Sequence, residues 1–381
     1  MIPIARPSVG ALEAEAASAT IRSGWLTQGA QTAAFEREFA AAVGAPHACA
    51  VANCTSALHL ALLSVGVRPG DEVITVSHSF IATANAIRYC GGEPVFVDIE
   101  PDTYNMAVGR LAEAVTAQTR AILCVHQMGM PCDLSAILEL ARDRGLAVVE
   151  DAACAIGSEI LADGAWERVG RPRADVACFS LHPRKVITTG DGGMLTTADP
   201  ERDRLFRLWR QHGMTVSDLD RHSAFQVTTE AYPIIGYNYR LTDVQASIGR
   251  KQLERLPALI ARRRALAAHY VELLADIEGL VLPVEPSWAR SNWQSYCVRL
   301  PPETDQRRVM QAMLDRKIAT RRGIMCAHRE APYAAVPARH SLLESERAQD
   351  RCLLLPIYAE MSETDQQMVA NALRYALRSC A

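Results

Sequence analysis

Residues 48–98 read ACAVANCTSALHLALLSVGVRPGDEVITVSHSFIATANAIRYCGGEPVFVD and alternate between two kinds of pattern. Three short apolar runs with β-branched residues lie at 48–52, 73–76 and 95–98, and helical periodicity lies between them at 56–65 and 81–89. Strands that alternate with helices form a mainly parallel sheet covered by helices on both faces. The stretch therefore predicts an α/β fold.

The same alternation continues along the chain and gives seven strands in all. Four further strands are predicted at 121–125, 147–150, 176–180 and 194–197, with a helix at 134–144. Polar residues follow several strands, as at 53–56, 77–80, Asp151 and 180–182. Ligands of open α/β sheets bind beyond the carboxyl ends of the strands, so we expect the chemistry there.

The pattern changes after Asp243, where a long helix rich in Arg and Leu is predicted through about Leu274. Beyond it lie a strand candidate at 295–300, a helix near 305–316 and a last helix from about Glu363. We therefore predict a large domain of residues 1–250 and a smaller C-terminal α+β domain of residues 251–381.

Composition excludes several classes of protein. The chain has 381 residues, 49% of them hydrophobic, and a formal charge of −3, so it is no disordered protein and has no global field that favours nucleic acid or an anionic membrane. We find no signal peptide and no apolar run of about 18 residues. The 11 cysteines include no C-x-x-C pair, which indicates free thiols in a cytoplasmic protein without structural zinc.

Three elements carry candidate chemistry. Lys185 ends the stretch Ser-Leu-His-Pro-Arg-Lys, which follows a predicted strand, and it precedes a glycine-rich turn. If its amine is desolvated in a pocket, it can act as a nucleophile. The alternative is a solvated lysine in a surface loop. Asp151 ends a buried strand, where it could pair with a protonated ring nitrogen or cap a helix. Residues 53–57 are predicted to begin a helix and carry hydroxyl side chains. Such a helix start can bind a phosphate, or Thr55 can simply cap the helix.

Together these elements are typical of one kind of cofactor site. A lysine holds an aldehyde as a Schiff base, a carboxylate keeps a pyridine nitrogen protonated, and a helix terminus holds a phosphate. Pyridoxal 5'-phosphate (PLP) requires this set of groups.

The chain resembles the DegT/DnrJ/EryC1/StrS sugar aminotransferases, which are fold-type I PLP enzymes. Five blocks carry the resemblance, in the family's order: 24–36 with GWLTQG and Phe35-Glu36, 53–62, 79–85, 180–193 and 236–246. The resemblance implies that residues 1–250 bind PLP, or pyridoxamine 5'-phosphate (PMP) between the half-reactions, and that the chain forms a homodimer with shared active sites.

The resemblance also implies a role for particular residues. Lys185 would form the Schiff base and Asp151 would pair with the pyridinium. Phe80 would stack on the ring, although an aromatic there could equally belong to the core. The phosphate would be bound by Thr55, Ser56, Ser180 and, from the other subunit, Asn238, which could otherwise be a turn residue.

Two departures and some weaker candidates complete the site. Cys154 stands where the family has His or Gln beside the cofactor, and Asp191 stands where it commonly has Glu. Trp25 and His328 are candidates for the substrate side, with a surface histidine as the alternative for His328. Cys178 and His182 lie in a strand and loop rather than on a helix, so no metal is predicted.

The predicted function is transfer of an amino group, from glutamate as donor, to the keto carbon of a nucleotide-linked deoxy sugar. An aminotransferase for scyllo-inosose-type cyclitols is the alternative, because such relatives share the same blocks. Deoxy-sugar dehydratases of the family replace the lysine by histidine, so Lys185 counts against that reading. A regulatory descendant without turnover would have little reason to keep Lys185, Asp151 and the phosphate turn together.

Overall fold

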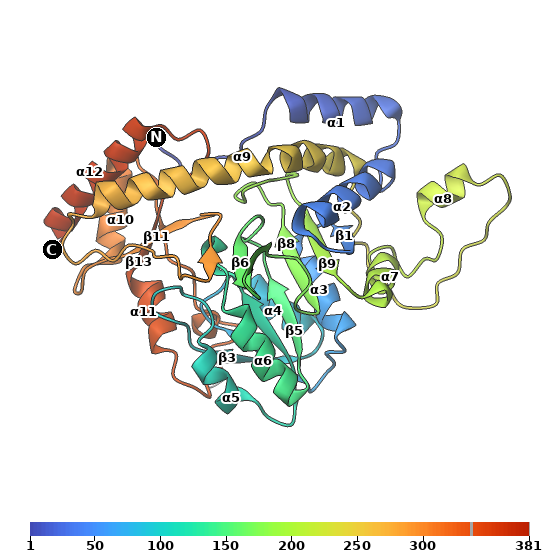
Figure 1. Ribbon diagram of the computed structural model, residues 1–381, viewed down its shortest axis with the longest axis horizontal. Coiled ribbons are helices and arrows are strands. Elements are labelled where there is room, and N and C mark those ends of the chain that lie inside the picture. The colour runs from blue at the N-terminus through green and yellow to red at the C-terminus, as the bar shows by residue number, and fades with distance from the viewer. Residues whose placement is uncertain (336–337, 381) are drawn as a thin grey trace.

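The computed structural model describes residues 1–335 and 338–380, and a seven-stranded sheet forms the centre of its larger lobe (Figure 1). The strand order is β1-β9-β8-β5-β4-β2-β3. These strands are β1 (His47–Val51), β2 (Glu72–Val76), β3 (Glu93–Val97), β4 (Thr119–Val125), β5 (Ala147–Asp151), β8 (Val176–Ser180) and β9 (Gly193–Thr197). Strand β9 runs antiparallel to β1 and β8, and the other neighbours are parallel. The predicted α/β fold and its seven strands are confirmed.

Helices cover both faces of the sheet, so β2, β8 and β9 are buried along their whole length. One face packs against α2 and α6 through side chains such as Phe39 and Ile137, and the other against α3, α4 and α7 through Leu58, Ile87 and Phe206. The helices of this lobe are α2 (Ala30–Val43), α3 (Cys54–Ser64), α4 (Ala82–Tyr89), α5 (Leu111–Ala114), α6 (Leu134–Arg144) and α7 (Pro200–Trp209).

The long helix α9 (Asp243–Leu274) joins the two lobes and has the predicted bounds, and α1 (Ala11–Ser23) lies along it (Figure 1). Its first half contributes Leu256 to the core around the sheet, and its second half contributes Tyr270 to the core of the smaller lobe. At its start, Asp243 accepts hydrogen bonds from the backbone N–H groups of Gly29 and Thr32. The carboxylate therefore fixes the beginning of α2 against α9.

The smaller lobe packs helices against a three-stranded sheet in the order β11-β13-β12. Its elements are β11 (Tyr296–Arg299), α10 (Gln306–Asp315), β12 (Arg321–Arg322), α11 (Leu343–Arg351), β13 (Cys352–Leu355) and α12 (Glu363–Cys380). Ile2, at the other end of the chain, is buried in this core and bridges to Ile318. The division at 250/251 stays a prediction, and α9 runs through it without a break.

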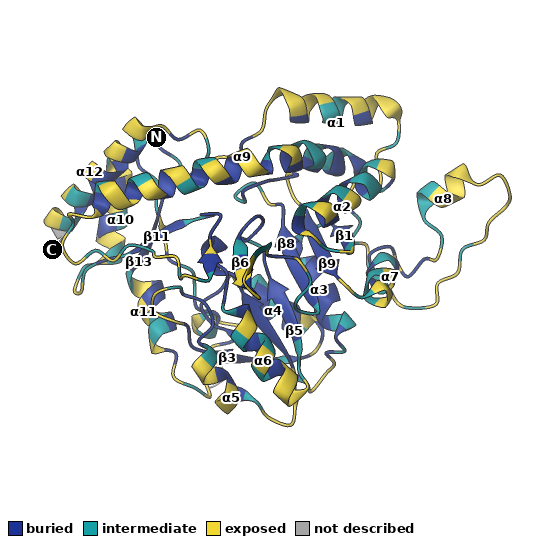
Figure 2. Ribbon diagram, in the orientation of Figure 1, coloured by how far each residue is buried: buried dark blue, intermediate teal, exposed yellow. Residues whose placement is uncertain are grey.

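Two features lie outside the sequence-based expectations. A small sheet of β10 (Ala289–Arg290), β6 (Glu159–Ala162) and β7 (Ala165–Arg168) connects the loop after β5 to the segment before β11. The segment after α7, which carries α8 (Asp218–Ser223), extends away from the body of the molecule and is exposed (Figures 1 and 2). It presents Phe225, Val227 and Ile235 to solvent.

Across residues 1–335 and 338–380, the structure contains no helix long and apolar enough to cross a membrane.

Candidate active site

Lys185 lies in a tight turn that begins where β8 ends. The Leu181 N–H donates to the carbonyl of Gly192 at 2.9 Å, and the Thr189 N–H donates to the carbonyl of Leu181 at 3.0 Å. Within the turn, the Lys185 N–H donates to the carbonyl of His182 at 2.8 Å. These bonds close the loop 181–192 on itself and fix the backbone from which the half-buried Lys185 side chain projects.

Asp151 is the last residue of β5 and is only 5% exposed. Its carboxylate accepts hydrogen bonds from the Thr83 hydroxyl at 2.8 Å and from the Ala153 N–H at 3.2 Å. The Thr83 hydroxyl also lies 2.7 Å from that of Ser79, which leads back to the loop after β2. Burial raises the pKa of Asp151, and the hydrogen bond from Thr83 offsets only part of that effect.

Lys185 and Asp151 influence each other's charge. Strands β5 and β8 are parallel neighbours, so their carboxyl ends meet at one edge of the sheet. The positive charge of Lys185 favours ionisation of Asp151, which opposes the increase in its pKa. Lys185 Nζ donates a hydrogen bond to Cys154 Sγ at 3.1 Å. The structure therefore brings together an amine, a buried carboxylate and a thiol.

The predicted phosphate turn forms the start of α3. The Asn53 side chain caps this helix and accepts hydrogen bonds from the Ser56 N–H at 2.9 Å and the Ser56 hydroxyl at 3.1 Å. The first N–H groups of a helix have no partner within it, so those of Cys54 and Thr55 remain directed at the space before the helix. Thr55 itself is half-buried.

Gly193 brings the phosphate turn and the end of β8 together. It pairs with Val51 at the end of β1 and with Ser180 at the end of β8. A Cβ atom at Gly193 would lie 2.4 Å from the carbonyl oxygen of Asn53. The close approach therefore requires glycine, and it places Ser180, which is 8% exposed, beside the start of α3.

Two further predicted residues lie on the surface of the single chain. Phe80 is 69% exposed, at the start of the segment that leads into α4. Asn238 is also exposed and forms an isolated β-bridge with Gln211. The segment that carries Asn238 runs beside residue 52 of its own chain, because the Ala52 N–H donates to the carbonyl of Tyr239 at 2.8 Å. The roles of both residues stay predictions.

The two candidates for the substrate side are engaged within the chain. Trp25 is half-buried, and its Nε1 donates to the carbonyl of Gln28 at 3.4 Å. His328 Nδ1 lies 2.6 Å from the hydroxyl of Ser77, the residue after β2, and its Nε2 lies 3.1 Å from the Glu346 carboxylate. The fold thus brings His328 from the smaller lobe to the carboxyl edge of the large sheet.

Sequence reasoning missed the groups that support Asp151. Thr83 lies inside the block 79–85, but nothing in its spacing shows that it hydrogen-bonds Asp151 across the sheet edge. Behind β5, the fully buried His126 ring pairs with Glu150 at 2.8 Å. The backbone N–H of His126 also donates a hydrogen bond to the backbone carbonyl of Asp151 at 3.1 Å. The position of His126 just after a predicted strand was the signal that could have indicated it.

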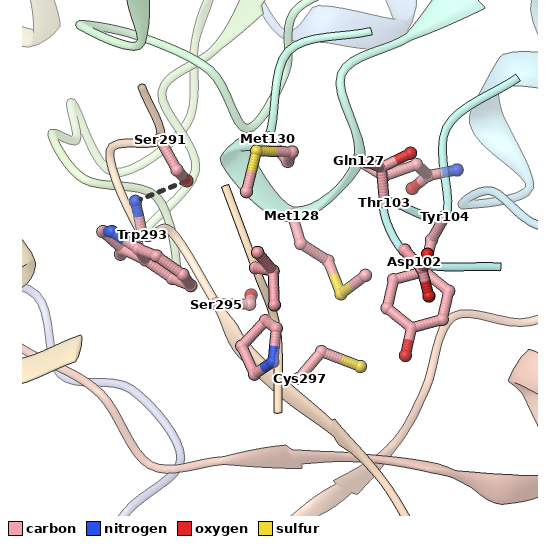
Figure 3. A pocket seen from close by; sticks show the side chains of 12 residues that line it. Asp102, Thr103, Tyr104, Gln127, Met128, Met130, Ser291, Trp293, Ser295 and Cys297 are labelled. Atoms are coloured by element: carbon pink, nitrogen blue, oxygen red, sulfur yellow. Dashed lines mark hydrogen bonds between the residues drawn. The ribbon is translucent and has the colours of Figure 1, made fainter. Parts of the chain in front are cut away.

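A separate small cavity lies between the loops after β3 and β4 and the segment before β11. Figure 3 shows Met128, Trp293 and Cys297 among the side chains that surround it. None of the predicted site residues lines this cavity. It is distinct from the site around Lys185.

Several solved aminotransferases share the fold of this chain. TlmJ, an aminotransferase from Streptoalloteichus hindustanus, is 35% identical, with a TM-score of 0.89 over 100% of this chain and 99% of its own. Spr1654 from Streptococcus pneumoniae, solved in its PMP form, is 25% identical, with a TM-score of 0.93 over 100% of both chains. DesI, solved in the presence of its TDP-sugar product, is 30% identical, with a TM-score of 0.88 over 99% of this chain and 93% of its own.

The family comparison covers almost the whole chain. Residues 7–374 match the DegT/DnrJ/EryC1/StrS aminotransferase family, which confirms the resemblance carried by the five blocks. The chain belongs to this family and is a PLP-dependent aminotransferase that works with PLP and PMP.

Proposed function

We propose that the enzyme transfers an amino group from an amino-acid donor, glutamate, to the keto carbon of a nucleotide-linked deoxy sugar. The observation that carries the chemistry is the buried carboxylate of Asp151, whose ionisation is favoured by the positive charge of Lys185 at the same edge of the sheet. The similarity to DesI, which was solved with a TDP-sugar product, supports the sugar class.

The residues present fit PLP. A carboxylate as buried as Asp151 is costly without a cationic partner, and a protonated pyridine nitrogen is such a partner. Thr55, Ser56 and Ser180 surround the start of α3, where free N–H groups and the helix dipole favour a phosphate. Phe80, which follows β2 at the carboxyl edge of the same sheet, offers an exposed aromatic face.

The roles that we assign follow from this fit. When bound, PLP supplies an electron sink for the carbon that gains or loses the amino group. Lys185 Nζ holds the cofactor covalently and, once displaced by the donor, moves a proton as general base and acid. Asp151 keeps the ring nitrogen protonated, with Thr83 and the Ala153 N–H orienting its oxygens.

The rest of the proposal concerns assembly and substrate. Asn238 reaches the phosphate in the partner subunit of a homodimer, for which its exposed position is suitable. Trp25 and His328 contact the substrate side. We propose a cytoplasmic enzyme, because the ten cysteines up to Cys352 are free thiols.

Turnover with a panel of substrates tests the function. The holoenzyme and glutamate are incubated with TDP- or UDP-linked keto sugars or with scyllo-inosose, and each aminated product is identified by its mass. We expect one nucleotide-linked keto sugar to be aminated. Turnover confined to scyllo-inosose would contradict the sugar assignment, and no turnover with any acceptor or donor would contradict the proposal as a whole.

Cofactor attachment provides a separate test of Lys185. We predict absorbance near about 420 nm in the purified protein, because the linked cofactor is a long-wavelength chromophore. Borohydride reduction should fix the cofactor to the peptide that contains Lys185, and Lys185→Ala should lose both the covalent link and transamination. A Lys185→Ala variant with normal turnover would contradict the assignment.

A further inference from the structure

Cys154 lies against the reactive atom of the site. Its Sγ accepts a hydrogen bond from Lys185 Nζ at 3.1 Å, although the two residues are 31 positions apart. The other nine cysteines up to Cys352 are buried, whereas Cys154 is partly exposed. Its thiol therefore faces the space around Lys185 rather than the apolar core.

The backbone of Cys154 is held from the opposite side by Asn292, which is fully buried. Asn292 Nδ2 donates to the carbonyls of Cys154 and Ile156 at 2.8 and 2.9 Å. Asn292 in turn lies against Gly129, where a Cβ atom would come within 2.0 Å of Asn292 Oδ1. These contacts fix the backbone of the loop after β5, so the fold itself directs the thiol at Lys185.

The charged and titratable groups around this pair lie on four segments. Asp151 precedes Cys154 on the same loop, and Cys54 lies at the start of α3. Arg184 interacts with Cys154 from the lysine turn, and it is itself influenced by Arg321 from the smaller lobe. Burial alone would lower the pKa of Lys185, but the combined effects of Cys154, Cys54 and Asp151 are larger and raise this pKa.

We propose that Cys154 is a further catalytic residue, whose sulfur binds Lys185 Nζ and shares its proton whenever that amine is not linked to the cofactor. In one arrangement an ammonium at Nζ donates to a thiolate, and in the other a neutral amine at Nζ accepts from the thiol. The proton moves between the two atoms, so the pair holds the same number of protons in both arrangements. The sulfur thus keeps the freed lysine in position to act as acid and base. This proposal rests on the role that we propose for Lys185.

The test measures the pH dependence of Lys185 in the PMP-loaded enzyme, where the lysine is free. Trace acetylation with isotope-labelled acetic anhydride between about pH 6 and pH 11 gives the titration curve of the Lys185 peptide by mass spectrometry. In Cys154→Ala, we expect Lys185 to react about threefold to tenfold faster near pH 8, which corresponds to a pKa lower by about half a unit to one unit. Cys154→Ser should lie between Cys154→Ala and the wild type.

Cys90→Ala is the matched control, because Cys90 is a buried thiol that hydrogen-bonds the carbonyl of His59. It should leave the Lys185 curve unchanged. A Cys154→Ala curve that overlays the wild type, or that shifts to higher pH, would overturn the proposal. The thermal midpoint of each variant shows that it is folded.

The PLP-loaded enzyme separates this failure from a failure of the proposed function. There, Lys185 should be protected from acetylation in every variant that keeps the lysine. Equal labelling with PLP and PMP would show that Lys185 does not carry the cofactor. Protection by PLP combined with an unchanged Cys154→Ala curve would leave the function intact and reject only the role of Cys154.

Discussion

Asp151 shows at the scale of one residue how function and stability oppose each other. Its carboxylate ends a buried strand, so burial raises its pKa and makes the charged form unfavourable in the cofactor-free protein. Hydrogen bonds from Thr83 and the Ala153 N–H and the positive charge of Lys185 offset part of this cost, and a protonated ring nitrogen would offset more of it. The residue therefore weakens the empty fold and is better compensated when the cofactor is bound.

We predict that Asp151→Asn lowers the rate of proton transfer by at least about 100-fold, in line with other deletions of catalytic charge. The same substitution should raise the thermal midpoint of the cofactor-free protein. The pKa of Asp151 is higher in the folded state than in the unfolded state, so at any pH above the unfolded-state value the carboxylate lowers the free energy of unfolding. Single-turnover absorbance and thermal melts of both forms measure these effects. Near-native rates, or a less stable cofactor-free variant, would contradict them.

How far the sequence predicts the site also depends on individual residues. Lys185 and Asp151 could be predicted because each follows a strand, and the carboxyl ends of parallel strands meet at one edge. The contact of Cys154 with Lys185 could not, because it depends on a loop conformation that Asn292 fixes from 138 positions away. The bond from Thr83 to Asp151 likewise joins segments 68 positions apart.

At the scale of elements, the junction of β1, β9 and β8 positions the phosphate turn. Gly193 sits between the ends of β1 and β8, and its backbone approaches Asn53 more closely than any side chain allows. The sequence shows a glycine-rich turn here, but only the sheet order explains which glycine is indispensable.

We predict that Gly193→Ala weakens PLP binding by at least about tenfold, because a Cβ atom 2.4 Å from the Asn53 carbonyl must displace β9 or the start of α3. Titration of the cofactor-free protein with PLP, followed by absorbance, gives the dissociation constant. Gly109→Ala is the control, since a Cβ atom there meets nothing within 4 Å. Equal affinities for the two variants would reject this explanation.

An ion-pair network joins α2, β1 and α7. The buried Glu36 accepts hydrogen bonds from Arg207 at 2.7 Å and from the Ala50 N–H at 2.9 Å, and it also pairs with Arg210. Burial alone would raise the pKa of Glu36, but Arg210 and Arg207 outweigh it and hold this pKa below the usual value. The stabilisation is therefore present above a pH of about 4.5 and is lost as the pH falls through the lowered pKa.

We predict that Glu36→Gln lowers the free energy of unfolding at pH 7 by about 3–5 kcal/mol, because it leaves the buried Arg210 without a counter-charge. The loss should shrink in acid, where the wild-type carboxylate is protonated as well. Urea unfolding at pH 7 and below about pH 4 measures the difference. Glu38→Gln, which affects a more exposed pair with Arg250, should cost no more than about 1 kcal/mol. The same loss at both pH values would contradict the role of charge.

At the scale of the whole molecule, the sequence predicts the large sheet better than the periphery. All seven strands have strong local patterns, and helices cover both faces, so local preference and tertiary packing agree. The edge sheet of β6, β7 and β10 depends on pairing between distant short segments and has no such pattern. The exposed positions of Phe225 and Val227 have no packing explanation within a single chain.

These exposed apolar side chains favour the proposed dimer. Phe225, Val227 and Ile235 lie on the segment between α7 and α9, which extends from the body and also carries Asn238 (Figure 2). Exposed apolar surface of this kind is typical of an interface. A two-fold symmetric contact through the segment would bury these residues in both subunits and give two equivalent sites.

Complementation between two inactive variants tests whether each site is built from two chains. Lys185→Ala removes the cofactor lysine, and Asn238→Asp should repel the phosphate, so each variant alone should be inactive. In a heterodimer, one site receives both intact residues and the other receives both substitutions. A randomly exchanged equal mixture should therefore recover about a quarter of the wild-type turnover, since about half of the dimers are mixed and each has one intact site. Confirmed subunit exchange without recovered turnover would show that Asn238 acts in its own chain, beside its own residue 52, or not at the cofactor.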